Sequence, residues 1–484
     1  MSRESFKRLS NNIWEVPIDF KPGMNVPARI LSSPELFDSI DDRVIDQITN
    51  VACLPGIKKA AFCMPDGHVG YGFPIGGVAA FAKDDGIISP GGIGFDINCG
   101  MRLLRTNLTL DMIKPKMEYL LASLFSTIPS GVGSKGFVKL SRGSFNRLME
   151  SGAQWCLEND FATETDLEFI ENQGCIENAD SSAVSEKAIF RGINQMGTLG
   201  SGNHYLEVEV APREGVFDQT LAEKFGVTVD DQILIAIHCG SRGFGHQIAT
   251  DYLQVFNKCM GKYGLEVRDR ELMSAPIDSD EGRRYFRAMA CAANSAFANR
   301  QLIVSGIRRV FRSVFGQSDK ELGIETIYDV AHNIAKFEKY EIDGREETLL
   351  VHRKGATRSF GPGRAEIPAQ YRDIGQPVIV GGSMETGSAL LCGTKYADDE
   401  TFGSSLHGAG RTMSRMKAKK STRGEQVRQR MKDSGILVKT GYMPGLAEEA
   451  AFAYKNIDAV VEAVHEIGIS KKVARFYPVL NIKG

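Results

Sequence analysis

Short apolar segments separated by glycine turns dominate the early part of this chain. Between residues 51 and 105, the stretches LPGI, MPDGHVGYGFPIGG and ISPGGIGFDINCG alternate apolar residues with Gly, Pro and Asp. This pattern is typical of short strands joined by tight turns. Backbone that is rich in such loops commonly carries binding and catalytic side chains.

Longer periodic stretches predict the other elements. Apolar residues at three-to-four spacing predict helices over 112–125, 283–315 and about 448–467. The segments DQILIAIHCG (231–240) and QPVIVGGS (376–383) are typical of buried strands that end in glycine loops. Helices and strands therefore both contribute, without a regular βα alternation.

No repeat, low-complexity tract or Pro/Ser-rich linker divides the 484 residues, so we expect one compact α+β domain over residues 1–484. The longest apolar runs, such as ILIAI at 233–237, are far below the ~18 residues of a membrane span. Nine cysteines without a CxxC pair, after an opening MSRESFKRLS that lacks an apolar signal, indicate a reducing cytoplasm.

The formal net charge is −2, so any nucleic-acid site must be a local basic patch rather than a global field. One such patch is KAKKSTRGEQVRQRMK at 417–432. It is either the solvated face of a helix or a basic segment that touches RNA phosphates, and the residues alone leave both interpretations open.

The histidines gather at turns. Of only eight, five lie beside glycine, asparagine or other small residues, and another, His332, lies in IYDVAHNIAK. A single histidine is more often a hydrogen-bonded structural residue than a ligand, but several on glycine-flanked turns favour a functional site. The five are His68, His204, His238, His246 and His407.

The turn FDINCG places Asp96 and Cys99 three residues apart, where a carboxylate and a thiolate can face one pocket. Together with imidazoles, these donors suit Mn, Zn, Fe or Co, and a thiolate can bridge two ions. The alternative is a structural turn with an inert buried cysteine.

In HGAGR, an imidazole directly precedes a flexible backbone turn. Gly408 and Gly410 would let the main chain approach a phosphate, and Arg411 offers forked donors. The neutral nitrogen of His407 can also accept a phosphoryl group and pass it on. A simple phosphate-binding turn explains the same letters equally well.

Further groups near these turns could hold a polyphosphate or an RNA backbone. The loop GGSMETGS offers backbone amides and the hydroxyls of Ser383 and Ser388, although it is not a P-loop. Each cation taken singly is more often a surface charge. The candidate cations are Arg191, Arg242, Arg353, Lys354 and Arg411.

Several of these blocks occur in one order that resembles the RtcB family of RNA-splicing ligases. They include SPGGIGFDINCGMRLLRTNL, GTLGSGNHYLEVE, HCGSRGFGHQ, DVAHNIAK, VHRKGATR and SLHGAGRTMSR, and the likeness extends over about residues 13–484. The resemblance implies a single compact body whose mixed and antiparallel sheets form a central cleft flanked by helices.

The resemblance also implies a role for each matching residue. Two manganese ions would be held by Asp96, Cys99 as the bridging ligand, His204, His238 and His332, and His407 would be the guanylated nucleophile. RNA or its phosphates would meet Arg191, Arg242, Lys354 and Arg411. GTP would contact Asn203, Tyr205, Glu207, Ser383, Ser388, Gly408, Gly410, Tyr454 and Lys483.

By this resemblance the chain would be a cytoplasmic ligase that uses GTP and Mn²⁺. It would join RNA ends bearing a 3'-phosphate or 2',3'-cyclic phosphate to 5'-hydroxyl ends in tRNA splicing or RNA repair, with RNA as partner and archease as a possible helper. Two other interpretations are a dinuclear metallophosphoesterase that uses no nucleotide and a non-catalytic RNA-binding subunit.

Three positions depart from the family pattern. Gly381 replaces an expected proline, Glu385 replaces an expected glycine, and Cys239 stands where Ser or Thr commonly follows the metal histidine. The proposed ligands and nucleophile are unaffected. These departures therefore bear on nucleotide affinity, metal preference or oxidation sensitivity more than on reaction type.

Overall fold

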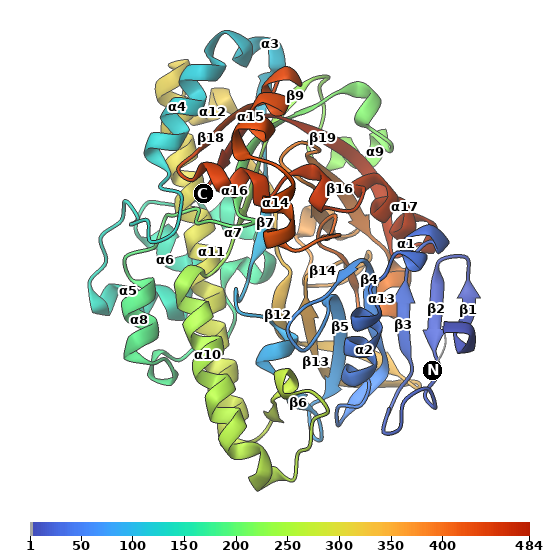
Figure 1. The fold of residues 1–484 in the computed structure, drawn as a ribbon. Helices are drawn as coiled ribbons and strands as arrows, with labels where there is room; N and C mark the ends of the chain where they lie inside the picture. Colours follow the sequence, from blue (N-terminus) through green and yellow to red (C-terminus); the bar gives the residue numbers. More distant parts are fainter. Residues whose placement is uncertain (1–2) are drawn as a thin grey trace.

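Two large β-sheets form the framework of the computed structural model, which describes residues 3–484 (Figure 1). In the first sheet, neighbouring strands are antiparallel except for the third and fourth, which are parallel. Its spatial order is β1 (Lys7–Ser10), β2 (Ile13–Val16), β3 (Ala28–Leu31), β4 (Ile57–His68), β5 (Ile75–Ala82), β13 (Arg345–Lys354) and β12 (Asn333–Ile342).

The second sheet has eight strands and curls toward a barrel, because its last strand contacts the first two. Its spatial order is β11 (Glu325–Ala331), β7 (Gly100–Thr109), β9 (Gln232–Cys239), β8 (Tyr205–Ala211), β19 (Ser470–Lys483), β16 (Ser388–Gly393) and β15 (Pro377–Gly381), with β18 (Leu437–Thr440) parallel to β19. Two short pairs complete the strands: β14 (Ala356–Arg358) with β17 (Ser404–Leu406), and β6 (Ile87–Ile88) with β10 (Ala275–Pro276).

The longest helix, α11 (Asp280–Phe315), runs along one flank of the molecule (Figure 1). The Ser279 side chain caps its first turn and Gly316, in the left-handed conformation, ends it. At 36 residues it is about 54 Å long. It packs against α10 (Arg242–Cys259), α4 (Met117–Thr127), α5 (Arg142–Ser151) and α6 (Ala153–Glu158).

The other α-helices are short and lie at the edges and ends of the sheets (Figure 1). They are α1 (Pro34–Asp38), α2 (Asp42–Val51), α3 (Leu110–Ile113), α7 (Glu164–Glu168), α8 (Glu186–Gly192), α9 (Gln219–Lys224), α12 (Asp319–Leu322), α13 (Lys395–Thr401), α14 (Arg415–Ser421), α15 (Gly424–Asp433), α16 (Met443–Glu448) and α17 (Ile457–Ile467).

All three predicted helices and both predicted strands are present. The helix predicted over 112–125 is α3 followed by α4, and the one over 283–315 is α11. The third helix, predicted over about 448–467, is α17 with the predicted buried stripe, but the predicted start was wrong because α17 begins only at Ile457. There the Asn456 side chain accepts hydrogen bonds from two amides of the first turn.

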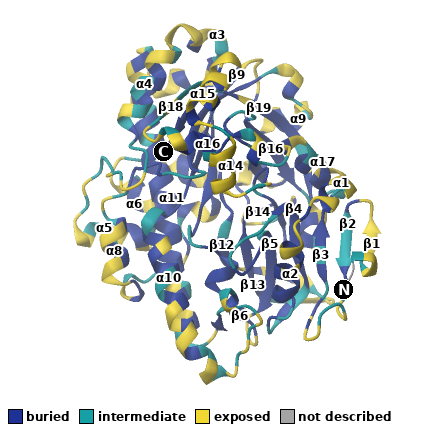
Figure 2. Cartoon of the chain, viewed as in Figure 1, coloured by how far each residue is buried: buried dark blue, intermediate teal, exposed yellow. Residues whose placement is uncertain are grey.

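Burial follows the two sheets, which are largely dark blue in Figure 2. Every residue of β9 is buried, as expected for a strand covered on both faces. The predicted class, an α+β body with mixed and antiparallel sheets flanked by helices, is confirmed. Among the described residues, no helix combines the length and apolar character that crossing a bilayer requires.

Candidate functional site

A cleft of about 660 Å³ opens where strand ends of the two sheets approach each other. Three separate glycine-containing segments, at 66–68, 381–383 and 407–410, form part of its wall. The predicted site residues that line it are Asp96, Cys99, Asn203, Tyr205, His238, His332, Ser383, His407, Gly408, Gly410, Arg411, Tyr454 and Lys483.

Four neighbouring strands of the second sheet bring the predicted metal ligands to one edge. His332 follows β11, Cys99 precedes β7, His238 lies near the end of β9 and His204 precedes β8. Because these strands are mutually antiparallel, the end of one lies beside the start of the next. The amide of His332 donates to the carbonyl of Cys99 at 2.8 Å, which fixes that register.

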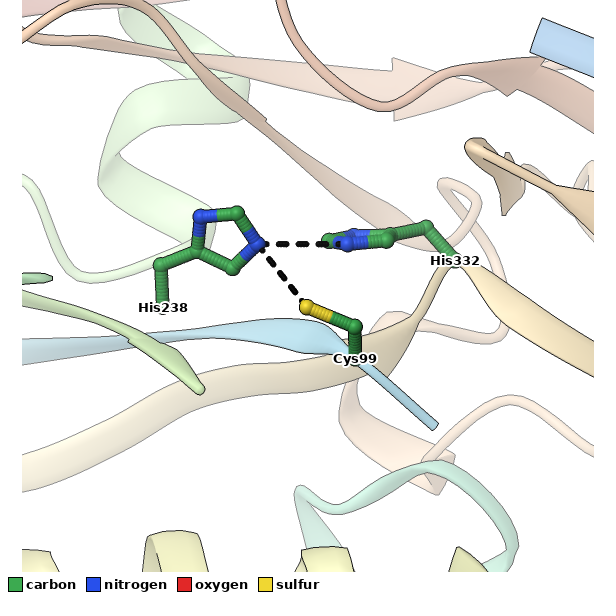
Figure 3. A group of neighbouring side chains, drawn as sticks. All are labelled: Cys99, His238 and His332. Carbon is green, nitrogen blue, oxygen red and sulfur yellow. Dashed lines mark hydrogen bonds between the residues drawn. The ribbon is translucent and has the colours of Figure 1, made fainter. Parts of the chain in front are cut away.

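The donor atoms form two groups that share one sulfur. Cys99, His238 and His332 make one group and Asp96, Cys99 and His204 the other, with the atoms of each group within 4.8 Å of one another. The Cys99 Sγ lies 3.2 Å from His238 Nε2 and 3.4 Å from His204 Nε2. Figure 3 shows Cys99 and His332 both directed at the same nitrogen of His238.

Contacts of its two ring nitrogens fix the orientation of His204 in the site. Its Nδ1 lies 3.0 Å from the Leu199 carbonyl, and its Nε2 lies 2.7 Å from Asp96 Oδ2. A carbonyl on one ring nitrogen fixes the tautomer and leaves the other nitrogen for a cation. Burial opposes ionisation of Asp96, but a protonated His204 outweighs it and lowers the carboxyl pKa to about 2; a metal cation at Nε2 would take the place of that proton.

The electrostatics of the first group suit a cation. Burial lowers the pKa values of His238 and His332 well below the usual value, so both rings are neutral and can donate a lone pair. Burial also raises the pKa of the Cys99 thiol to about 12, so a thiolate there requires a compensating positive charge. The combined sulfur, imidazole and carboxylate donors fit a borderline transition metal such as Mn, Zn, Fe or Co.

Helix α11 supports this edge of the sheet from behind with buried polar side chains. Arg300 bonds both carboxylate oxygens of Asp329 at 2.8 Å and donates to the carbonyls of Asn98 and Cys239, also at 2.8 Å. Asn299 donates to the Cys239 Sγ at 3.1 Å. The loops on either side of Cys99 and His238 are therefore held by the interior of the protein itself.

The imidazole of His407 lies directly beside the donor group that contains His332. Its ring centroid lies 4.8 Å from that of His332. Its Nδ1 lies 2.5 Å from Asp66 Oδ2, and the same oxygen accepts from the backbone amides of His407 and Gly408. A carboxylate on Nδ1 holds the proton there, so Nε2 is the nitrogen free to act as a nucleophile.

Asp66 was missed by the sequence reasoning, although it lies two residues before His68 in the quoted MPDGHVG. It is fully buried on β4, between Cys63 and His68, where the pairing with β5 shifts register. Bulges of this kind commonly redirect a side chain into a site. The sequence offered one indication of its role. Asp66 lies in the glycine-containing segment MPDGHVG, which resembles the glycine-containing HGAGR segment of His407.

Close backbone contacts explain the glycines around His407. A side chain at Gly410, which has a φ of +73°, would place its Cβ 2.1 Å from the Asp66 carbonyl. The amide of Gly381 donates to the His407 carbonyl at 3.2 Å, and Ala409 donates back to the Gly381 carbonyl at 2.9 Å. The histidine turn is thus clamped between β4 and the end of β15.

Glu207 and Ser388, two of the predicted nucleotide contacts, do not line the cleft. The Ser388 hydroxyl donates to both carboxylate oxygens of Glu209, at 2.6 and 2.7 Å. Glu207 is buried beside Glu209 and accepts from the Asn481 amide. Burial, with the second carboxylate as a smaller cause, raises the pKa of Glu207 well above its usual value.

A buried carboxylate that the sequence reasoning missed organises the opposite wall. Glu449 is 2% exposed and pairs with Arg411 at 3.3 Å and Arg415 at 3.1 Å. It also accepts from the Tyr454 hydroxyl and lies 4.0 Å from Lys483 Nζ. Three cations around one carboxylate leave a net positive wall, which suits an anionic ligand.

The other predicted phosphate contacts lie away from the cleft. Arg191 donates to Gln247 at 2.9 Å, and Arg242 lies behind the metal group with Nη1 3.3 Å from His204 Nδ1. Lys354 is 3% exposed and donates to the backbone carbonyls of Tyr71, Phe73 and Gly91. Burial lowers the pKa of Lys354 to about 7.

The two remaining turn histidines differ from the ligands. His68 lines the cleft, and burial lowers its pKa to about 4, so its ring is neutral. His246 lies in α10 and stacks on Phe95 with 4.9 Å between ring centroids. Neither belongs to the two donor groups among the described residues.

Comparison with known proteins places the chain in a family. The family model described as tRNA-splicing ligase RtcB matches residues 47–484. The chain belongs to the RtcB family. It is 50% identical to the tRNA-splicing ligase RtcB of Archaeoglobus fulgidus over 478 residues, which is 99% of this chain and 98% of that one. It is 48% identical to that of Thermococcus kodakarensis over 479 residues, again 99% and 98% of the two chains.

The first departure from the expected RtcB pattern, Gly381, matches its surroundings. A Cβ at this position would lie 2.6 Å from the hydroxyl oxygen of Tyr205. A proline would also lack the amide that donates to His407. The second departure, Glu385, accepts from Arg430 at 2.8 Å and from the Ala451 amide at 2.8 Å, so it ties α15 to the segment before α17.

The third departure, Cys239, does not add a donor to the two groups that share the Cys99 sulfur. It follows His238 on β9, so its side chain lies on the opposite face of the sheet. Its Sγ lies 3.0 Å from the Leu199 carbonyl and 3.1 Å from Asn299 Nδ2. Its thiol belongs to the packing beneath the site.

We predict that Gly381→Ala destabilises this RtcB protein and that Tyr205→Phe in the same chain restores it. The added methyl meets the tyrosine hydroxyl at 2.6 Å, and such overpacking costs about 1–3 kcal/mol. Removing the hydroxyl opens that space. Urea unfolding of the wild type, both single variants and the double variant measures the coupling, and a double variant no more stable than Gly381→Ala would contradict it.

Proposed function

We propose that this protein is a GTP-dependent RNA ligase of tRNA splicing or RNA repair. It joins a 3'-phosphate or 2',3'-cyclic phosphate end to a 5'-hydroxyl end through a histidine-bound GMP. The curated relatives carry the name tRNA-splicing ligase RtcB, which supports the ligase activity and an RNA substrate. We further propose one catalytic domain over residues 1–484, working in the cytoplasm.

This proposal is carried by the position of His407. Its ring lies between the Asp66 carboxylate and the two donor groups that share the Cys99 sulfur. Asp66 holds Nδ1 at 2.5 Å, and the ring lies 4.8 Å from that of His332. A hydrolase needs only an activated water beside its metals. An imidazole with one nitrogen bonded and the other free, at the wall of a cleft with a cationic side, suits group transfer through nitrogen.

In the first step, His407 Nε2 attacks the α-phosphorus of GTP. A nitrogen–phosphorus bond forms as the bond to the pyrophosphate oxygen breaks, and the pair of electrons leaves with pyrophosphate. Asp66 retains the Nδ1 proton and stabilises the charge that develops on the ring. Arg411 and Lys483, which line the cleft, would neutralise phosphate oxygens, and Tyr205 and Tyr454 would flank the nucleotide.

In the second step, an oxygen of the RNA 3'-phosphate attacks the GMP phosphorus and His407 leaves as neutral imidazole. In the third, the 5'-hydroxyl of the other RNA attacks the activated 3'-phosphorus and GMP departs. Asp96, Cys99, His204, His238 and His332 would hold two Mn²⁺ ions, which supply Lewis-acid neutralisation of phosphoryl oxygens when bound. A cyclic phosphate would first be opened by hydrolysis.

Labelling with GTP tests the proposal directly. The wild type with Mn²⁺ and α-labelled GTP should form an acid-labile protein–GMP adduct, which RNA bearing 3'-phosphate and 5'-hydroxyl ends should discharge. His407→Gln should form none while keeping its Mn²⁺, whereas His68→Gln, at the same cleft, is the matched control. Undiminished labelling of His407→Gln would refute the nucleophile, and an unlabelled wild type that hydrolyses phosphoesters would favour a metallophosphoesterase.

RNA binding without either activity would indicate a non-catalytic subunit. Archease is added to the labelling reaction before that conclusion is drawn.

A further inference from the structure

The segment 415–439, here called the basic arm, concentrates the positive charge of the chain. It contains nine Lys and Arg against two acidic residues, a net charge of +7, whereas the whole chain has −2 and the remainder therefore −9. It consists of α14, α15 and β18. A polyanion approaching this molecule is therefore attracted to one side of it.

The inner cations of the arm are anchored to the body by buried or half-buried carboxylates. Arg415 pairs with Glu449 at 3.1 Å, Lys419 with Glu448 at 2.5 Å, and Arg430 with Glu385 at 2.8 Å. The arm is thereby held in a defined orientation. The Glu385 that departs from the expected family pattern is one of these three anchors.

The outer cations remain available. Lys417 and Lys420 are three residues apart on α14, and Arg428 and Lys432 are four apart on α15, so each pair shares a helix face. All four side chains are exposed. Among residues 3–484, four arm cations outside the anchors lack an acidic partner and lie on these helices: Lys417, Lys420, Arg428 and Lys432.

The arm continues directly from the cleft. Met413, Ser414 and Arg415 line the cleft, and α14 begins at Arg415. Met416 is 71% exposed beside this rim and Tyr442 is 51% exposed, with Lys419 Nζ 5.2 Å from its ring centroid. Exposed apolar and aromatic groups among cations suit nucleobases as well as phosphates. Figure 2 shows α14 largely in yellow, facing solvent.

We propose that the outer face of the basic arm binds the backbone of the RNA substrate beyond the cleft. This rests on the proposed ligase function and extends it, since it adds a docking surface away from the reacting ends. The cleft holds the terminal phosphate and the arm holds nucleotides that lead into it. The interaction is electrostatic and independent of base sequence.

A fourfold variant tests the arm. Lys417, Lys420, Arg428 and Lys432 are all changed to Gln, and a matched control changes four unpaired exposed lysines on other elements: Lys7, Lys224, Lys258 and Lys320. Binding of a fluorescent 3'-phosphate RNA of about 20 nucleotides is measured by anisotropy over a range of salt. The arm variant should bind roughly 10- to 100-fold more weakly, with a salt slope shallower by about 3 if all four cations meet single-strand phosphates.

RNA length and nucleotide labelling separate this inference from the proposed function. A dinucleotide with a 3'-phosphate, which has no further nucleotides to place along the arm, should bind both variants equally. Protein–GMP formation should be unchanged in both variants. A labelled wild type with equal long-RNA affinity in the arm variant would overturn the arm alone, whereas an unlabelled wild type would overturn the ligase proposal. Binding of both variants to anionic lipid vesicles is measured as well. If the arm variant binds vesicles more weakly than the control but binds RNA equally well, the arm is not an RNA surface.

Discussion

A Cys99→Ser variant should lose both Mn²⁺ ions together. Its sulfur belongs to both donor groups, lying 3.2 Å from His238 Nε2 and 3.4 Å from His204 Nε2. Because partners one shell further out already contribute about 10- to 100-fold to metal affinity, loss of a shared ligand should cost at least about 100-fold. Metal analysis and Mn²⁺ titration of the purified variant measure this, with circular dichroism to verify the fold.

The neighbouring thiol provides the control for that experiment. Cys239 is also buried near the cluster, but it lies on the opposite face of β9, where Asn299 donates to it. Cys239→Ser should therefore keep two Mn²⁺ per chain. Equal metal loss in both variants would show that local packing, not ligation by Cys99, determines loading.

An Asp66→Asn variant should form the protein–GMP adduct about 10²- to 10⁴-fold more slowly. The oxygen that faces Nδ1 also accepts from the backbone amides of His407 and Gly408, so an asparagine would place its carbonyl oxygen there. The ring would keep its tautomer but lose the negative charge that stabilises it as it becomes cationic. The corresponding Asp-to-Asn change costs about 10⁴-fold in a serine protease triad, which sets the upper end of this range. Single-turnover labelling with GTP gives the rate.

Two further measurements make the Asp66 result specific. Metal content should stay at the wild-type level, since Asp66 is in neither donor group. Asp398→Asn changes another buried aspartate, whose carboxylate accepts from the Gly361 amide at 3.2 Å outside the cleft lining. It should label normally. Normal labelling of Asp66→Asn would mean that the negative charge of Asp66 does not assist the attack by His407.

Asp96, Cys99 and a set of turn histidines could be picked out from the sequence pattern, whereas the choice of His204, His238 and His332 as ligands came from the resemblance to the RtcB family. DINCG, NHYLEVE and IAIHCG each place a donor next to an apolar strand, and antiparallel neighbours bring such ends together. What the sequence could not provide is the place of each side chain relative to the cleft. Glu207 shares a face of β8 with the cleft-lining Tyr205 but lies further along the strand, where it accepts from Asn481, and the Ser388 hydroxyl bonds Glu209.

Long-range contacts explain the other differences between the predicted and the observed structure. Lys354 ends strand β13 and was predicted to meet phosphate, yet it is held by three carbonyls from two distant segments. The apolar residues 450–453 continue a helical pattern, but a 3-10 turn there keeps Glu449 and Tyr454 in the cleft wall. Such contacts join residues hundreds of positions apart, and local periodicity carries no trace of them.

The polar support from α11 has a consequence for how the protein acquires its cations. Arg300 and Asn299 already fix the strand ends through bonds to Asn98 and Cys239, so the receptor for the ions is preformed by the apoprotein. In a small zinc module, by contrast, much of the metal-binding free energy is spent on folding the chain. We therefore expect the free energy of ion binding at this site to contribute to affinity rather than to folding, and ions to exchange without unfolding of the chain.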